Sequence, residues 1–184
     1  MENTRNPCLN DANYYNYLQY GGGLPESPQY DIIVINDNTR AQARQSTREQ
    51  SLYVLENVWA DYILESGAVP VFISTYGSWT PYRDMTGLDS VANFTSLTYN
   101  GYQEYAALLE ELFPPEQRPR IAKVGHAFLL VYEENCQLWA RMFHVDGIHA
   151  SPLGTYLQGL CVYYAIYGKM PLAKIAFQSA PSNM

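Results

Sequence analysis

Short continuous apolar runs alternate along the chain with longer stretches in which apolar residues recur at helical spacing. The first continuous run, Asp31 to Ile35, is aliphatic and β-branched after its first residue, which is typical of a strand buried on both faces. Apolar residues then recur at helical intervals from Thr47 to Glu65, and Gly67 is expected to end this helix. The run from Val69 to Ser74 predicts a second buried strand, so these elements form a β-α-β unit.

The second half of the chain continues the alternation. An irregular segment is expected from Thr75 to Ala92, and a helix from Leu97 to Phe113, where Pro114 and Pro115 would stop it. Ile121 to Val124 predicts a third short strand. The pattern predicts a three-layer α/β/α domain of flavodoxin type, in which right-handed crossovers cover both faces of a parallel sheet.

The sequence predicts both ends of the last helix. Ser151 supplies an N-cap and Pro152 the first helical residue, while Gly168 and Pro171 mark the end. The domain is therefore expected to span residues 31–171. An irregular N-terminal segment (1–30) precedes it, and a C-terminal tail (172–184) follows.

Composition narrows the function classes. The 184 residues are 47% hydrophobic and 16% charged, as in a folded globular domain. A net charge of -7 with no basic cluster argues against nucleic acid as a partner. No apolar run is long enough to cross a bilayer, and secretion would require a signal peptide upstream of Met1. The three cysteines lack metal-type spacing, so no structural zinc site is expected.

Asp146 and His149 are the strongest candidates for catalytic residues. At a spacing of three residues, in a loop that leads into a helix, the carboxylate can accept the Nδ1 proton of the imidazole. That contact would leave Nε2 free to act as a base. A structural histidine held by one hydrogen bond is the alternative interpretation of the same spacing.

The segment D-G-I-H-A-S-P-L-G-T-Y-L, followed by an apolar helix and Y-G-K-M-P, resembles the final block of the SGNH hydrolases, the GDSL-like esterases. The resemblance extends over Tyr30 to Pro171, because Y-D-I-I-V-I-N-D-N, F-I-S-T-Y-G and V-G-H-A-F are similar to successive strands of that family. It implies hydrolysis of a small acyl or carbohydrate ester without a cofactor. His149 would be the general base and acid, and Asp146 would orient it.

The resemblance also implies an oxyanion hole, in which a side-chain amide stabilises the charge that develops on the attacked carbonyl. Asn36 is the matching residue and Asn38 the second choice; an ordinary polar turn is the alternative for both. The glycine run 21–23 would match the family's second block, although a flexible turn explains it equally.

The family's nucleophilic serine has no counterpart. It belongs to a G-D-S or G-N-S turn after a first strand, whereas the only serine before Asp31 is Ser27, in P-E-S-P with no apolar strand ahead of it. The fold is therefore expected without its first strand and helix, and the chain alone is expected to be inactive. It is either part of an active hydrolase or a noncatalytic relative. Ser78 is the best-placed replacement nucleophile.

Further residues are candidates for lining the substrate cleft because they follow predicted strands: Asn38, Tyr76, Ser78, Trp79 and His126. Two other interpretations stay open. His144, Asp146 and His149 offer metal ligands in one local run, and the aromatic segment from Tyr76 to Tyr82 could serve a noncatalytic module that binds a glycan or a protein.

Overall fold

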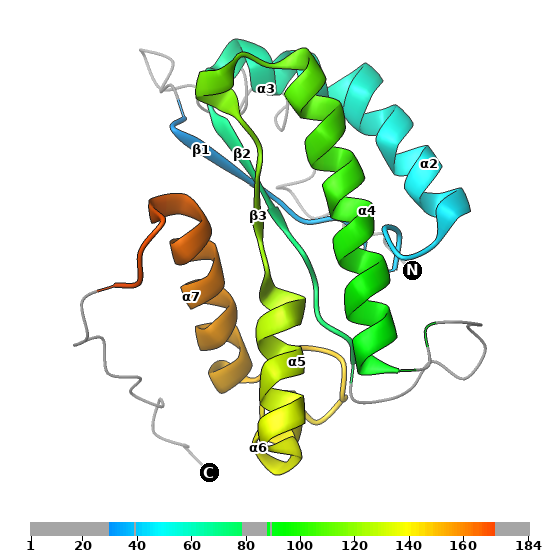
Figure 1. Ribbon diagram of the computed structural model, residues 1–184, viewed down its shortest axis with the longest axis vertical. Helices are drawn as coiled ribbons and strands as arrows, with labels where there is room; N and C mark the ends of the chain where they lie inside the picture. Colours follow the sequence, from blue (N-terminus) through cyan, green and yellow to red (C-terminus); the bar gives the residue numbers. More distant parts are fainter. Residues whose placement is uncertain (1–29, 39, 79–87, 89, 172–184) are drawn as a thin grey trace, which may run out of the picture.

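The computed structural model describes residues 30–38, 40–78, 88 and 90–171. Its centre is a parallel sheet of three strands, β1 (Ile32–Ile35), β2 (Val69–Ile73) and β3 (Arg120–Ala122), in the order β1-β2-β3 (Figure 1). Ile32 lies opposite Val69, and Val71 lies opposite Arg120. The predicted α/β class with a parallel sheet is confirmed. The third strand is shifted, because Val124 begins a helix and does not end the strand.

The predicted helix between β1 and β2 is divided into three parts. It comprises α2 (Gln45–Val54), the π-helical turn η3 (Leu55–Trp59) and α3 (Ala60–Ser66). The wider π turn rotates the apolar stripe, so that Leu55 and Ile63 both enter the core. Gly67 ends α3 with a φ of 73°, as the sequence predicts.

Helix α4 (Val91–Leu112) starts earlier than the predicted Leu97. Ser90 is its N-cap, and the Ser90 hydroxyl accepts a hydrogen bond from the Asn93 backbone N–H at 3.1 Å. The helix ends before Phe113, and a 3₁₀ turn, η4 (Pro115–Gln117), leads to β3. The predicted irregular segment therefore overlaps the first turn of this helix.

Three helices follow β3. Helices α5 (Val124–Glu134) and α6 (Cys136–Arg141) have no counterpart in the sequence prediction. Helix α7 (Pro152–Tyr167) has the predicted Ser151 cap and ends at Gly168 in the left-handed conformation, so both predicted ends are confirmed. Among the described residues, no helix is long and apolar enough to cross a membrane.

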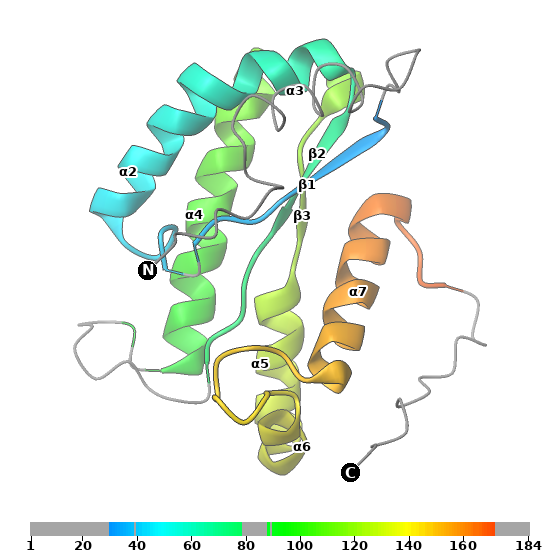
Figure 2. The same cartoon turned by 180° about the vertical axis from the view of Figure 1, so that it is seen from behind.

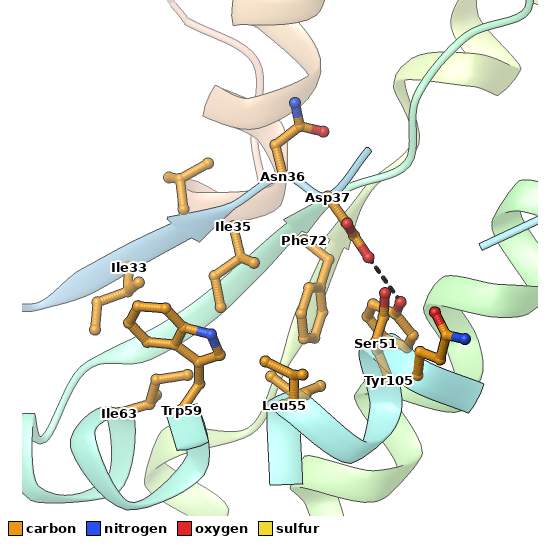
Figure 3. A pocket seen from close by; sticks show the side chains of 13 residues that line it. Ile33, Ile35, Asn36, Asp37, Ser51, Leu55, Trp59, Ile63, Phe72 and Tyr105 are labelled. Atoms are coloured by element: carbon orange, nitrogen blue, oxygen red, sulfur yellow. Dashed lines mark hydrogen bonds between the residues drawn. The ribbon is translucent and has the colours of Figure 1, made fainter. Parts of the chain in front are cut away.

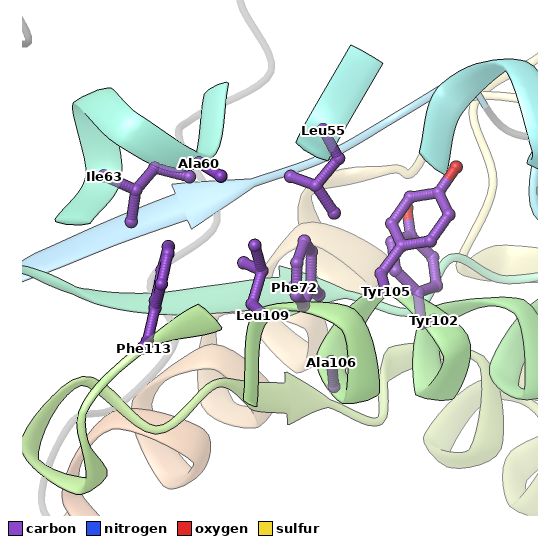
Figure 4. Packing of buried hydrophobic residues seen from close by; sticks show 9 residues of the cluster. All are labelled: Leu55, Ala60, Ile63, Phe72, Tyr102, Tyr105, Ala106, Leu109 and Phe113. Atoms are coloured by element: carbon purple, nitrogen blue, oxygen red, sulfur yellow. The ribbon is translucent and has the colours of Figure 1, made fainter. Parts of the chain in front are cut away.

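Apolar clusters lie on both faces of the sheet, which gives the expected three layers (Figures 1 and 2). Figure 4 shows the cluster between the sheet and the helices α2, α3 and α4. It consists of Leu55, Ala60, Ile63, Phe72, Tyr102, Tyr105, Ala106, Leu109 and Phe113. On the other face, Val71 and Ala122 pack against residues of α5, α6 and α7, including Phe128 and Trp139.

Candidate active site

The segment from Phe143 to Ala150, here called the Asp–His loop, joins α6 to α7. Within it, the Nδ1 atom of His149 lies 2.6 Å from Oδ2 of Asp146, a hydrogen-bond distance. The other carboxylate oxygen, Oδ1, accepts hydrogen bonds from the backbone N–H groups of Ile148 and His149, each at 2.9 Å. These contacts hold the carboxylate beside the imidazole on the Nδ1 side.

The same contacts explain the electrostatics of Asp146. Its pKa is held well below the usual range of a carboxyl group, first by the His149 side chain and then by the two backbone donors. Asp146 is therefore ionised at neutral pH and is ready to accept the Nδ1 proton. The predicted spacing thus produces the expected hydrogen bond, while the catalytic role of the pair stays a prediction.

Backbone hydrogen bonds close the base of the Asp–His loop. Phe143 and Ala150 form an antiparallel bridge, and the His144 N–H donates to the His149 carbonyl at 2.7 Å. Next to it, the Ser151 N–H donates to the Met142 carbonyl at 2.8 Å. The Ser151 hydroxyl donates to the Arg141 carbonyl at 2.8 Å and accepts from the Gly154 N–H at 3.3 Å. The N-cap of α7 therefore also fastens the loop.

Two glycines of the motif are explained by local geometry. Gly147 has a φ of 69°, a left-handed conformation that lets the loop turn between Asp146 and His149. Gly154, in the first turn of α7, packs so closely that an added Cβ would lie 2.2 Å from the Met142 carbonyl oxygen. The helix can approach the loop only because this position has no side chain.

The imidazole is open to solvent in the described part of the molecule. The His149 side chain is 80% exposed and that of Asp146 38% exposed. Among the described residues, Asp146 is the one hydrogen-bond partner of the His149 ring, and no hydroxyl group contacts it. Nε2 is therefore accessible to a substrate or to a nucleophile from outside these residues.

Residues after β2 and β3 meet the start of the Asp–His loop. The Tyr76 ring stacks on Phe128 of α5, with centroids 4.1 Å apart, and meets Phe143 edge-on at 5.6 Å. The Gly125 N–H donates to the Ser74 carbonyl at 2.8 Å. Tyr76 thus packs into the core beneath the loop, and one of its ring faces is covered and so cannot serve as an open wall for a substrate.

Asn36 and Asn38 follow the end of β1. No hydrogen bond or ring contact joins either residue to the Asp–His loop within the described residues. Asn36 lies at the rim of a cavity between β1 and α2, and its side chain points away from the apolar interior (Figure 3). Its neighbour Asp37 is the better-fixed residue, because Oδ2 of its carboxylate accepts a hydrogen bond from the Tyr105 hydroxyl at 2.9 Å. Sequence reasoning missed this link, which joins positions 68 residues apart.

The remaining candidates do not gather at the imidazole either. His126, in the first turn of α5, meets Tyr99 of α4 edge-on at 4.7 Å, and burial lowers the pKa of its imidazole. Ser78 is half-buried, and among the described residues no hydrogen bond joins it to the His149 ring. Trp79, Tyr82 and the glycine run 21–23 lie outside the described residues.

The side chains of His144, Asp146 and His149 are not arranged as metal ligands. His144 Nδ1 is 3.9 Å from Oδ2 of Asp146, on the same oxygen that contacts His149. Among the described residues, no group of three histidine, cysteine or acidic side chains is arranged to hold a metal ion. We therefore assign no step to a metal.

Comparisons with known proteins bear on the fold. No protein-family model matches the chain, and no curated protein matches it significantly. Among solved structures, it is similar to a putative SGNH hydrolase from Slackia heliotrinireducens, with a TM-score of 0.60 and 16% sequence identity. The match covers 86% of this chain and 73% of that chain. The fold is of the SGNH-hydrolase type.

On this SGNH-hydrolase fold, the Asp–His loop is the site with the most complete local geometry. Helix α7 anchors it through Ser151 and Gly154, and the aromatic residues after β2 support its first residue, Phe143. The loop offers a base, an orienting carboxylate and open space beside Nε2. Among the described residues, no nucleophilic hydroxyl group lies beside His149.

Proposed function

We propose that the chain carries the acid–base part of an SGNH-type ester-hydrolase site, acting on a small acyl or carbohydrate ester. The observation that carries this proposal is the 2.6 Å contact between His149 Nδ1 and Asp146 Oδ2, with the Nε2 side of the ring open. The SGNH-type fold supports it, because the pair sits directly before the last helix, where the motif resemblance expects the base.

In the proposed reaction, His149 Nε2 removes the proton from a hydroxyl nucleophile as its oxygen attacks the ester carbonyl. The imidazolium then gives that proton to the departing alcohol oxygen, and the acyl group stays on the nucleophile. In the second step, Nε2 removes a proton from water as the water oxygen attacks this acyl group, which releases the acid and restores the hydroxyl. Asp146 keeps the ring in the Nδ1–H tautomer and stabilises its positive charge. Asn36 stays the proposed amide donor to the oxyanion, because it follows β1 at the end of the sheet where the β2 loop also emerges.

The described residues around His149 do not include the nucleophile that this reaction needs. No described hydroxyl contacts His149, so we expect the chain alone to give little or no ester turnover. Ser78 is the proposed replacement if turnover is found, because it follows β2 and is half-buried.

Two measurements test the proposal separately. Nitrogen-15 NMR of His149 at pH 8 should show a proton on Nδ1, and Asp146→Asn should shift the ring towards the other tautomer. A neutral His149 ring with its proton on Nε2 in the unmodified chain would refute the acid–base role.

Hydrolysis of p-nitrophenyl acetate by the unmodified chain, His149→Ala and Ser78→Ala tests the nucleophile. Turnover that His149→Ala abolishes would overturn the expected inactivity.

A noncatalytic binding module on the same fold is the second candidate. The observation that favours it is the absence of a hydroxyl group beside the His149 ring within the described residues. This module would bind a glycan or a protein without catalysing a reaction. Calorimetric titration distinguishes the two, since binding that is equal in the unmodified chain and in His149→Ala would favour the module.

A further inference from the structure

Three buried hydroxyl groups lie where the end of β2 packs against α4. They belong to Ser74, Thr95 and Thr98, which are 0%, 1% and 0% exposed. Among the described residues, none of the three hydroxyl oxygens has a hydrogen-bond partner. A buried hydroxyl group without a partner is costly, and in native proteins such groups are usually satisfied by other protein groups or by ordered water.

The packing of α4 on the sheet places Thr98 towards the end of β2. The Tyr102 ring of α4 meets the Phe72 ring of β2, with ring centroids 5.9 Å apart (Figure 4). Helix α4 joins the parallel strands β2 and β3, so it runs antiparallel to β2 (Figure 1). Thr98 lies one turn before Tyr102 on the same helix face, and therefore further towards the end of β2.

Ser74 faces the same turn of α4. Its backbone N–H donates to the Ala122 carbonyl at 3.0 Å, which continues the ladder between β2 and β3. Side chains alternate along an extended strand, so Ser74 leaves β2 on the same face as Phe72. That face is the one that α4 covers. Ser74 and Thr98 thus form the next layer of this interface.

Thr95 belongs to the same neighbourhood. A Cβ added at Gly125 would lie 3.5 Å from the Thr95 Cγ2 atom. The Gly125 N–H in turn donates to the Ser74 carbonyl at 2.8 Å. Thr95 is therefore packed beside the residue that holds the end of β2.

This layer is built from small residues. The aromatic rings of Phe72 and Tyr102 set the spacing between α4 and the sheet in the layer above. The three hydroxyl-bearing side chains are much smaller, and at an equal spacing they leave space that a water molecule can occupy. A water molecule can donate two hydrogen bonds and accept two, whereas an apolar molecule would leave the hydroxyl groups unsatisfied. None of the three side chains carries a charge that would favour an ion.

We propose that Ser74, Thr95 and Thr98 hold an ordered buried water molecule that links α4 to the end of β2. This water would satisfy the three hydroxyl groups and fix the start of the segment that carries Tyr76 and Ser78. The proposal concerns the interior of the domain and is independent of the Asp–His pair.

Oxygen-17 relaxation dispersion of water in a solution of the full chain tests the proposal, because it detects water molecules held for longer than the tumbling time of the protein. Ser74→Ala combined with Thr98→Val removes two of the three partners, so the dispersion amplitude should fall by about one water molecule. Thr98→Ser keeps the hydroxyl group and should keep the amplitude. Thr155→Val, on the exposed side of α7, is the matched control and should also leave it unchanged.

Urea unfolding gives an independent sign test. In Thr98→Val, the bound water and the hydroxyl groups that remain lose a partner, so the unfolding equilibrium constant should rise about tenfold. An unsatisfied Thr98 hydroxyl would give the opposite sign, because valine removes the buried polar group and keeps the shape. Thr155→Val should change the constant little.

Three outcomes would overturn the proposal. The first is a dispersion of the unmodified chain without any long-lived water, a result that needs no variant to fold. The second is an unfolding equilibrium constant that falls in Thr98→Val. The third is an unchanged dispersion amplitude in the folded double variant, together with non-additive effects of its two substitutions on unfolding, which would mean that the hydroxyl groups bond to each other directly. Circular dichroism verifies that each variant is folded.

Discussion

Gly154→Ala should destabilise the protein by placing a methyl group where α7 touches the Asp–His loop. The added Cβ would lie 2.2 Å from the Met142 carbonyl oxygen and 3.2 Å from the Ala150 Cβ. The first distance is far below normal contact, and the obstructing atom belongs to the backbone. That carbonyl also accepts the Ser151 N–H at 2.8 Å, so the helix and the loop must separate or this hydrogen bond must distort.

Opposing contributions set the size of the effect. Alanine favours a helix over glycine by about 1 kcal/mol. Overpacking costs about 1–3 kcal/mol, and loss of the Ser151 hydrogen bond about 0.5–1.5 kcal/mol more. The net change in the free energy of unfolding should therefore be a loss of roughly 2 kcal/mol.

Gly159→Ala is the matched control in the same helix. An added Cβ there meets no atom within 4 Å, so the helical preference should act alone and stabilise the protein by about 1 kcal/mol. Urea unfolding of both variants at 25 °C, followed by circular dichroism, measures the two changes. Opposite signs are expected for the same chemical substitution, and a shared sign would refute the packing argument.

Two further predictions concern hydrogen bonds. Gln117→Met should cost about 1–3 kcal/mol of unfolding free energy, because the buried Gln117 amide donates to the carbonyls of Ile63, Leu64 and Ala68 at 3.1, 3.3 and 3.0 Å. Urea unfolding measures it, and Gln103→Met on the exposed face of α4 should change little; equal effects would contradict the role of these bonds. Asp146→Asn should be less stable than the unmodified chain at pH 6. The folded-state pKa of Asp146 is lowered, so its stabilising contribution is complete above the ordinary carboxyl pKa of about 4 and is lost as pH falls. Unfolding at pH 6 and pH 3 should show the difference between the two proteins shrinking, whereas a constant difference would refute the assigned cause.

The sequence predicted best those elements whose signals are local. Strands β1 and β2 follow from continuous apolar runs, and α7 follows from a cap, a proline and a terminal glycine. The pattern failed where tertiary packing decides the boundary. Helix α5 begins directly after β3 without a side-chain cap, so the sequence pattern places its first residue, Val124, in the strand.

The same division holds for the site. The contact between Asp146 and His149 is predictable because both residues belong to one short turn. The positions of Asn36 and Tyr76 depend on how the sheet packs against helices far away in the sequence. The stacking of Tyr76 on Phe128 is a contact of this kind, and its role in lining a substrate cleft stays a prediction.

The Asp–His loop is closed by hydrogen bonds of its own backbone. The bridge between Phe143 and Ala150, the Asp146 turn and the Ser151 cap all lie within about a dozen consecutive residues. The hydrogen bonds that orient the pair therefore all come from this one short segment. Substitutions in the rest of the domain can therefore leave these local hydrogen bonds in place.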